Sequence, residues 1–181
     1  MAAEPVREVQ QPNLRGLPDP GGLSVAAPAL ARLPLACHFQ TGADIDQAAA
    51  WLLQQETGFI GWQQVVGQWQ QRMLAHLADN TLPASIAIPL SATRIGSTTF
   101  VFIGAEVFNE YQLWQPRDRR VRLVSYTKGE GCYIPTAAAL AGGGYEVNTA
   151  PVFYGLPCAP GPESERVLLS AIAEQVRSVD V

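Results

Sequence analysis

Two apolar segments, each followed by glycine and then by a carboxylate or a phenol, most constrain the fold of this chain. Residues 100–103 are β-branched or aromatic, lead into Gly104 and are followed by Glu106. Residues 121–126 contain Val121, Leu123, Val124 and Tyr126 and lead into a glycine-rich loop that carries Tyr133. Such runs are typical of buried strands, and ligands of helix-covered sheets bind at the carboxyl ends of strands. We therefore expect Glu106 and Tyr133 side by side at one edge of a sheet.

The remaining periodic segments predict an α/β (mixed α+β) fold, with a mixed β-sheet flanked by helices. Residues 84–94 alternate apolar and small polar side chains, and a tight turn at 94–97 links them to the strand before Glu106. Further strands are expected at 33–39 and 121–125. Helices are expected from 41–44 to about 56, with Thr41 or Asp44 as the cap, and at 59–77, 107–114, 136–140 and 163–176.

Length and composition predict one domain that buries surface against something else. The chain has 181 residues, of which 48% are hydrophobic and only 15% charged. Residues 1–28 are rich in proline and glycine and are expected to form an irregular leader, whereas 29–181 carry the periodic pattern. Residues 151–162 are expected to be a proline-rich connection. The low charge favours contact with another subunit or with a missing part of the same fold.

Charge and cysteine content argue against two classes of protein. The net charge is −4 and the sequence pI is near 5.1, which argues against a nucleic-acid partner. The three cysteines are odd in number and lack CxxC spacing, so neither a zinc finger nor a disulfide framework is expected. Cys132 is expected to be a small buried thiol rather than a nucleophile.

Targeting and membrane signals are not expected in the chain as given. The beginning of the sequence lacks the continuous apolar segment of a secretory signal. No apolar run approaches the roughly 18 residues of a membrane-spanning helix. We therefore expect no transmembrane segment and a cytoplasmic location.

Glu106, Tyr133 and Tyr145 are the candidate site residues, and each has a structural alternative. Glu106 could simply complement a helix dipole, Tyr133 could be a half-buried core residue, and Tyr145 could anchor a loop. In the functional alternative, Glu106 and Tyr133 bind a dication, which lowers the phenol pKa. Tyr145, after three glycines, would then donate a hydrogen bond to a developing oxyanion.

Three motifs in this order resemble the neutral/alkaline non-lysosomal ceramidase family. Members of that family have Gly-Glu after a strand, then Tyr-x-Asn-Gly-Tyr-x-Gly-Tyr-Ile-Pro-Thr, then Gly-Gly-Tyr-Glu. This chain has, in the same order, Gly104-Ala105-Glu106, Tyr126-Thr127-Lys128-Gly129-Glu130-Gly131-Cys132-Tyr133-Ile134-Pro135-Thr136 and Gly143-Gly144-Tyr145-Glu146. The resemblance covers about residues 30–181 and places them in the C-terminal portion of a larger catalytic domain.

The resemblance implies a zinc-dependent hydrolase of N-acyl amide bonds, with ceramide or a related lipid amide as substrate. In the family, two histidines, one glutamate and one tyrosine hold a single zinc ion. The glutamate corresponds to Glu106 and the tyrosine to Tyr133, while Tyr145 corresponds to a residue that hydrogen-bonds the tetrahedral intermediate. Zinc would lower the pKa of its bound water and polarise the amide carbonyl.

The departures from the family pattern predict that this chain needs a partner. The family's zinc histidines precede the part that is matched here, and His38 and His76 do not stand in their context. Lys128, Glu130 and Cys132 replace the asparagine, the aromatic residue and the glycine that are usual in the loop. An N-terminal half or a separate subunit would supply the histidines, and the isolated chain is expected to be inactive. The alternative is a catalytically inactive remnant or binding module of the same fold.

Overall fold

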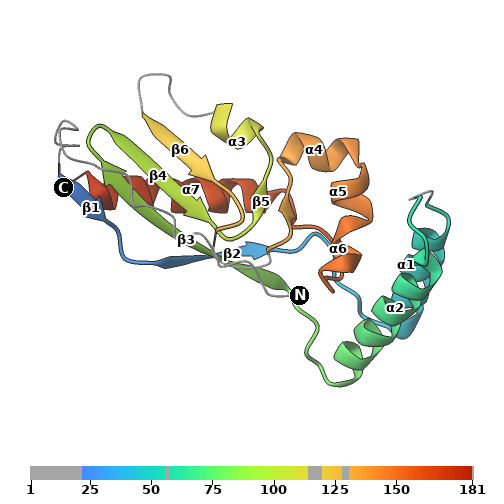
Figure 1. Ribbon diagram of the computed structural model, residues 1–181. Coiled ribbons are helices and arrows are strands. Elements are labelled where there is room, and N and C mark those ends of the chain that lie inside the picture. Colours follow the sequence, from blue (N-terminus) through green and yellow to red (C-terminus); the bar gives the residue numbers. More distant parts are fainter. Residues whose placement is uncertain (1–21, 56–57, 114–119, 128–130, 181) are drawn as a thin grey trace, which may run out of the picture.

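The computed structural model describes residues 22–55, 58–113, 120–127 and 131–180, and within them the chain forms a mixed sheet flanked by helices (Figure 1). This confirms the predicted α/β class. The strands of the main sheet are β1 (Leu23–Val25), β2 (Ala29–Pro34), β3 (Ser85–Ile95), β4 (Thr98–Ile103) and β6 (Val121–Val124). A separate two-stranded sheet consists of β5 (Glu106–Val107) and β7 (Tyr133–Ile134). The helices are α1 (Gly42–Leu53), α2 (Trp62–Ala78), α3 (Glu110–Leu113), α4 (Ala137–Gly142), α5 (Tyr145–Asn148), α6 (Ala150–Phe153) and α7 (Glu163–Val179).

Strand β3 is the centre of the main sheet because it is long enough to pair with three neighbours. Its first half pairs with β2 and its last residues pair with β1, both antiparallel. On its other side β3 pairs antiparallel with β4, through the predicted tight turn, in which Gly96 has a φ of 59°. Strand β6 then adds parallel to β4, so the sheet is mixed.

One face of the main sheet is covered by α7, which lies behind the strands in Figure 1. The apolar stripe of this helix, with Leu168, Ile172 and Val176, is buried in one core cluster with the inward residues of the strands. On β3 these inward residues include Ile88 and Leu90, both fully buried. The 3.6-residue period therefore predicted the buried face of α7 correctly, and the 2-residue period predicted the buried face of β3.

The opposite face of the sheet carries apolar side chains that remain exposed. Paired residues project to the same side of a sheet, so Val25, Thr93 and Phe100 lie together on this face. Leu23, Val25 and Leu30 are 71%, 64% and 62% exposed. This face thus retains the apolar surface that the low charge of the sequence led us to expect.

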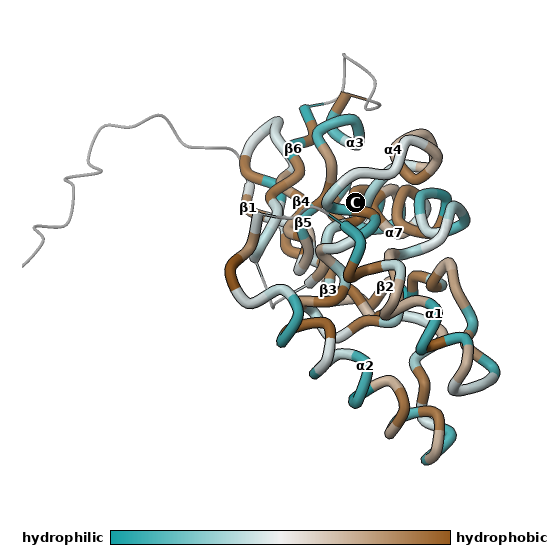
Figure 2. The backbone as a smooth tube through the Cα atoms, turned by 90° about the vertical axis from the view of Figure 1, so that its right-hand side faces the viewer, coloured by the Kyte–Doolittle hydropathy of each residue, from teal (hydrophilic) through white to brown (hydrophobic). Residues whose placement is uncertain are grey.

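Helices α1 and α2 form a hairpin beside the sheet with a core cluster of its own. Figure 2 shows hydrophobic and hydrophilic residues alternating along α2, as expected for an amphipathic helix. Its buried residues Val66, Trp69 and Met73 cluster with Ile45 and Leu52 of α1. Both helices were predicted from this periodicity, and the aromatic stripe on α2 is core packing, as expected.

Several predicted boundaries are wrong, in each case where a segment is short. The predicted helix 107–114 is reduced to α3, because Val107 is taken into β5 by pairing with Ile134; residue 114 lies outside the described residues. Strand β1 lies inside the predicted leader 1–28, of which residues 1–21 lie outside the described ranges. Strand β2 begins earlier than 33 and ends at Pro34, and the connection 151–162 contains part of α6.

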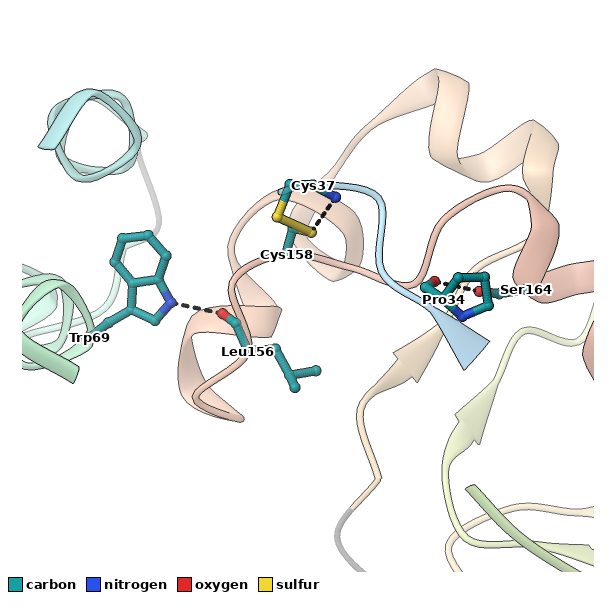
Figure 3. Close-up of a disulfide and its surroundings, with 6 residues drawn as sticks. All are labelled: Pro34, Cys37, Trp69, Leu156, Cys158 and Ser164. Atoms are coloured by element: carbon teal, nitrogen blue, oxygen red, sulfur yellow. Dashed lines mark hydrogen bonds between the residues drawn. A yellow bond between two sulfur atoms is a disulfide. The ribbon is translucent and has the colours of Figure 1, made fainter. Parts of the chain in front are cut away.

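The expectation of no disulfide is wrong as well. Cys37, between β2 and α1, is bonded to Cys158, between α6 and α7, over a sequence separation of 121 residues. Figure 3 shows this bond beside two hydrogen bonds, one from α2 to the connection between α6 and α7 and one from α7 to the end of β2. The indole nitrogen of Trp69 donates to the carbonyl of Leu156 at 2.7 Å, and the hydroxyl of Ser164 donates to the carbonyl of Pro34 at 2.8 Å. Disulfides persist mainly in oxidising compartments, so this bond favours such a compartment, and the cytoplasmic location stays a prediction.

Replacing Thr41 with alanine is expected to destabilise the helical hairpin. The Thr41 side chain accepts from the backbone N–H of Asp44, and the Asp44 carboxylate accepts from the N–H of Thr41 at 2.8 Å, which completes a capping box. Hydrogen bonds from the backbone N–H groups of Gln40 and Thr41 to this carboxylate hold the pKa of Asp44 below its usual value. Loss of the cap should lower the free energy of unfolding by about 1 kcal/mol. Urea unfolding measures this, and Thr41→Ser, which keeps the hydroxyl, should unfold like the wild type.

Candidate functional site

The small parallel sheet places Glu106 directly beside Tyr133. The two residues are register partners of β5 and β7. The backbone N–H of Glu106 donates to the carbonyl of Cys132 at 3.2 Å, and that of Phe108 donates to the carbonyl of Ile134 at 3.4 Å. The predicted proximity of Glu106 and Tyr133 is therefore confirmed, although 27 positions separate them. They lie in a separate two-stranded sheet rather than at the edge of the main one.

A close backbone approach makes this pairing possible. Gly131, immediately before Cys132, lies so near the turn after β4 that a Cβ there would sit 2.0 Å from the carbonyl oxygen of Gly104 and 2.6 Å from the Cα of Ala105. Only glycine fits such an approach without moving the backbone. Cys132 is buried, as predicted, and burial raises the pKa of its thiol to about 12, which keeps it protonated and unreactive. Lys128 and Glu130 lie outside the described residues.

Tyr126 is a member of the site that was not among the predicted site residues. It lies just beyond β6, and its hydroxyl donates to Oε2 of Glu106. Its backbone N–H donates to the carbonyl of Ala105, and its φ of 59° is left-handed, an unusual conformation for a tyrosine. The side chain is 56% exposed, so burial of its ring does not explain this position. Its sequence signals are its place at the end of a strand that leads to Tyr133 and its position as the first tyrosine of the second motif.

Tyr145 and Tyr154 extend the site through ring contacts with Tyr133. The ring centroids of Tyr133 and Tyr145 are 6.3 Å apart with the planes at 76°, and those of Tyr133 and Tyr154 are 6.3 Å apart at 77°. Tyr145 begins α5 after Gly143 and Gly144, both of which have positive φ. Its ring also lies 6.5 Å from that of Phe153. The three residues predicted for the site are thus brought together, and their catalytic and metal-binding roles stay predictions.

Glu106 contributes to the raised pKa values of three phenols, those of Tyr126, Tyr133 and Tyr154. Its hydrogen bond with Tyr133 raises the pKa of that phenol to about 12, with smaller contributions from burial and from its negative charge. The hydrogen bond from Tyr126 likewise raises the pKa of Tyr126. Burial, followed by the charge of Glu106, raises the pKa of Tyr154. The ion pairs of the described residues, Arg94–Asp180 and Arg166–Glu163, do not involve this carboxylate.

The oxygen atoms of Glu106 and Tyr133 could form part, but not all, of a zinc site. Glu106 and Tyr133 supply two oxygen ligands on adjacent strands, whereas a catalytic zinc usually has three protein ligands and a water. Among the described residues, no three side chains of His, Cys, Asp and Glu are grouped so that they could hold a metal. His76 does not extend this donor set: it lies near the end of α2, where its Nδ1 is 2.9 Å from the hydroxyl of Thr81. A zinc ion here would need ligands from outside the described chain.

An apolar pocket is lined in part by residues of α5, the helix that carries Tyr145. Its volume is about 240 Å³, and it runs along α5 and α6 to the disulfide. The walls are mainly aliphatic and aromatic, and they include Cys37, Phe39, Trp51, Val147, Val152 and Cys158. Such a pocket suits an apolar group of a few carbon atoms rather than a charged one.

Two further findings bear on the function of this chain. Among the described residues, no helix combines the length and the apolar character needed to cross a membrane. No protein-family model, curated protein or solved structure matches the sequence or the fold.

Proposed function

We propose that this chain is part of a ceramidase-like, zinc-dependent hydrolase of N-acyl amides, and that Glu106 and Tyr133 bind the metal. The observation that carries the proposal is the register of β5 and β7, which makes these two residues immediate neighbours with the ring of Tyr145 against Tyr133. Glu106, Tyr133 and Tyr145 come from distant positions in the sequence and were chosen by the motif resemblance. In the structure they lie close together.

Each residue has a distinct task in this reaction. Bound zinc would supply a water of lowered pKa and polarise the amide carbonyl. Glu106 contributes the negative charge that attracts the cation, and Tyr133 contributes the phenol oxygen beside it. Tyr145 is half exposed on the first turn of α5, and its hydroxyl would donate to the oxygen of the tetrahedral intermediate.

The apolar pocket lined by α5 and α6 supports the proposed substrate class. Val147, Pro151 and Val152 line it from the two helices that carry or contact Tyr145. Each buried methylene contributes about 0.8 kcal/mol, so a pocket of this kind favours an acyl chain over a polar head group. We therefore assign to it part of the acyl chain of a lipid amide, ceramide or a related one.

The histidines are proposed to come from an N-terminal half or a separate subunit that covers the open face of the sheet. That face exposes Leu23, Val25 and Leu30, and β4 leads from the same sheet directly to Glu106. A segment packed there would bury apolar surface and reach the metal ligands. An inactive binding module is the second candidate, and it is favoured by the incomplete donor set, because Glu106 and Tyr133 offer two oxygens where a catalytic zinc usually has three protein ligands.

The zinc content of the protein tests the hydrolase. Protein purified with its native partners and without chelator should contain about one zinc per chain. Glu106→Gln and Tyr133→Phe should lose this zinc, because each removes an oxygen ligand while keeping the size of the side chain. Elemental analysis measures the metal, and release of a fluorescent amine from an N-acyl amide measures the activity.

Tyr145→Phe is the matched control, because it keeps the ring contacts with Tyr133 and Phe153. It should retain zinc and lose about 100-fold or more in turnover, as expected for one oxyanion donor. Equal zinc in the wild type and in both ligand variants would contradict the proposed metal site. Zinc bound through Glu106 and Tyr133 without amide hydrolysis would support the binding module instead.

A further inference from the structure

A polar pocket of about 260 Å³ lies at the opposite end of β4 from Glu106. Glu106 lies just beyond the last residue of β4, whereas this pocket is lined by Thr99, near the first residue of β4, and by Val121, the first residue of β6. The turn between β3 and β4 and the C-terminal end of α7 complete its walls, and both lie at this end of the sheet (Figure 1). The pocket shares no residue with the candidate site or with the apolar pocket.

Two arginines from separate strands bring their guanidinium groups to this pocket. Arg94 belongs to β3, and Arg120 directly precedes β6. Nε of Arg94 donates to the carbonyl of Gly96 at 3.0 Å, and Nη1 of Arg120 donates to the hydroxyl of Ser97 at 2.6 Å. Gly96 and Ser97 form the turn between β3 and β4, so one turn holds both cations in position. Each guanidinium has five N–H donors, and these bonds leave several of them for a ligand.

The carboxylate of Asp180 shows that an oxyanion can bind at this place. It accepts from Nη1 of Arg94 at 3.1 Å, and the two side chains are 50% and 39% exposed. Ion pairs with this exposure contribute little to stability, so a ligand can replace Asp180 at small cost. With two arginines and one aspartate, the charged residues of the pocket sum to +1, whereas the whole chain has a net charge of −4. The pocket therefore attracts anions although the protein as a whole is acidic.

The donors of this pocket suit a phosphate group better than a carboxylate. Guanidinium groups bind both kinds of anion through paired N–H donors. A carboxylate offers two oxygens in one plane, and the fork of a single arginine satisfies both of them. Two forks from separate strands, with the hydroxyls of Ser97 and the buried Thr99 beside them, match instead the three oxygens and the nearly two negative charges of a phosphate monoester.

We propose that this pocket binds a phosphate monoester group, which Arg94 and Arg120 hold after it has displaced Asp180 from Arg94. The hydroxyls of Ser97 and Thr99 donate further hydrogen bonds to the phosphate oxygens. Both a soluble phosphorylated metabolite and the head group of a lipid carry such a group. Binding requires no zinc and no partner chain, so this site goes beyond the proposed hydrolase and does not depend on it.

Calorimetric titration of the wild-type chain with inorganic phosphate at low salt tests this site. We expect about one phosphate per chain. Arg94→Gln and Arg120→Gln should each weaken binding at least about tenfold, because each removes charge-assisted hydrogen bonds. Asp180→Asn should bind phosphate more tightly than the wild type, because it removes the competing carboxylate. Arg166→Gln is the matched control: it removes one positive charge from an exposed ion pair outside the pocket, and it should bind like the wild type.

Each outcome of these titrations decides for or against the pocket. Absence of phosphate binding in both the wild type and Asp180→Asn, or equal binding in Arg120→Gln and the wild type, would overturn the site. Acetate bound as tightly as phosphate would overturn the choice of anion. Asp180→Asn also keeps the test independent of folding losses, because the expected change is a gain of affinity.

Two further probes distinguish the sources of the phosphate group. Glycerol 3-phosphate represents a soluble metabolite, and phosphatidylcholine vesicles with and without phosphatidic acid represent a lipid head group. Binding of glycerol 3-phosphate alone assigns the site to a soluble ligand, whereas retention on the phosphatidic acid vesicles, lost in Arg120→Gln, assigns it to a lipid. Failure of both probes would overturn the assignment to a phosphate monoester.

Discussion

Gly131→Ala is expected to separate β7 from β5 and so to dismantle the candidate site. The added methyl group would lie 2.0 Å from the carbonyl oxygen of Gly104 and 2.7 Å from the Cβ of Ala105, both in the turn that leads to Glu106. These are atoms of a buried turn, so the two segments must move apart. Overpacking of this kind costs about 1–3 kcal/mol, and a clash with backbone belongs at the upper end.

Urea unfolding measures the loss of stability, and the zinc analysis measures the loss of the site. We expect Gly131→Ala to reduce the free energy of unfolding by about 3 kcal/mol and to abolish metal binding through Glu106 and Tyr133. Gly67→Ala is the matched control: Gly67 lies within α2 with no atom near its absent Cβ, so alanine there should stabilise the helix by about 0.5–1 kcal/mol. If Gly131→Ala retains both stability and metal binding, the close approach of the two segments is wrong.

Removal of the disulfide is expected to have the largest effect on stability. Cys37 and Cys158 close a loop of 121 residues in sequence, which contains the helical hairpin and most of the sheet. Loss of such a cross-link increases the entropy of the unfolded chain, and by chain-entropy arguments it costs about 4–5 kcal/mol. The double variant Cys37→Ser with Cys158→Ser should therefore unfold at a much lower urea concentration than the wild type.

Reduction of the wild type provides an independent measurement of the same bond. A reducing agent should bring the wild-type unfolding curve to that of the double variant, and it should leave the double variant unchanged. The remaining cysteine, Cys132, is buried and does not contribute a second bond. A wild type whose unfolding is insensitive to reductant would contradict the disulfide. Because both cysteines line the apolar pocket, reduction should also weaken binding of a fatty acyl probe.

The sequence predicted best those elements whose own periodicity is long enough to identify them. The α1–α2 hairpin, the β3–β4 pair and α7 each extend over many residues with one consistent apolar face. For these elements burial supports the local preference, so periodicity and tertiary packing agree. The capping box at Thr41 belongs to the same group, because it joins residues only three positions apart.

The errors occur where a short segment receives its structure from a distant one. Val107 was predicted to be helical, but it pairs with Ile134 and so belongs to β5. Leu23–Val25 forms a strand because it pairs with the end of β3. Such segments have two or three residues, too few for a period to be recognised. The disulfide was missed for a similar reason, because the spacing of three cysteines does not reveal which two meet.

By itself the sequence determined the α/β class, the buried faces of the long elements and the proximity of Glu106 to Tyr133. These depend on periodicity and on the rule that strands of a sheet end together, both of which can be read along the chain. Only the tertiary structure decided that Tyr126 reaches Glu106, that Tyr154 joins the phenols, and that Cys37 is bonded to Cys158. Those contacts depend on a left-handed backbone residue, on ring orientations and on loop positions, which are set by packing across the whole fold rather than by neighbouring residues.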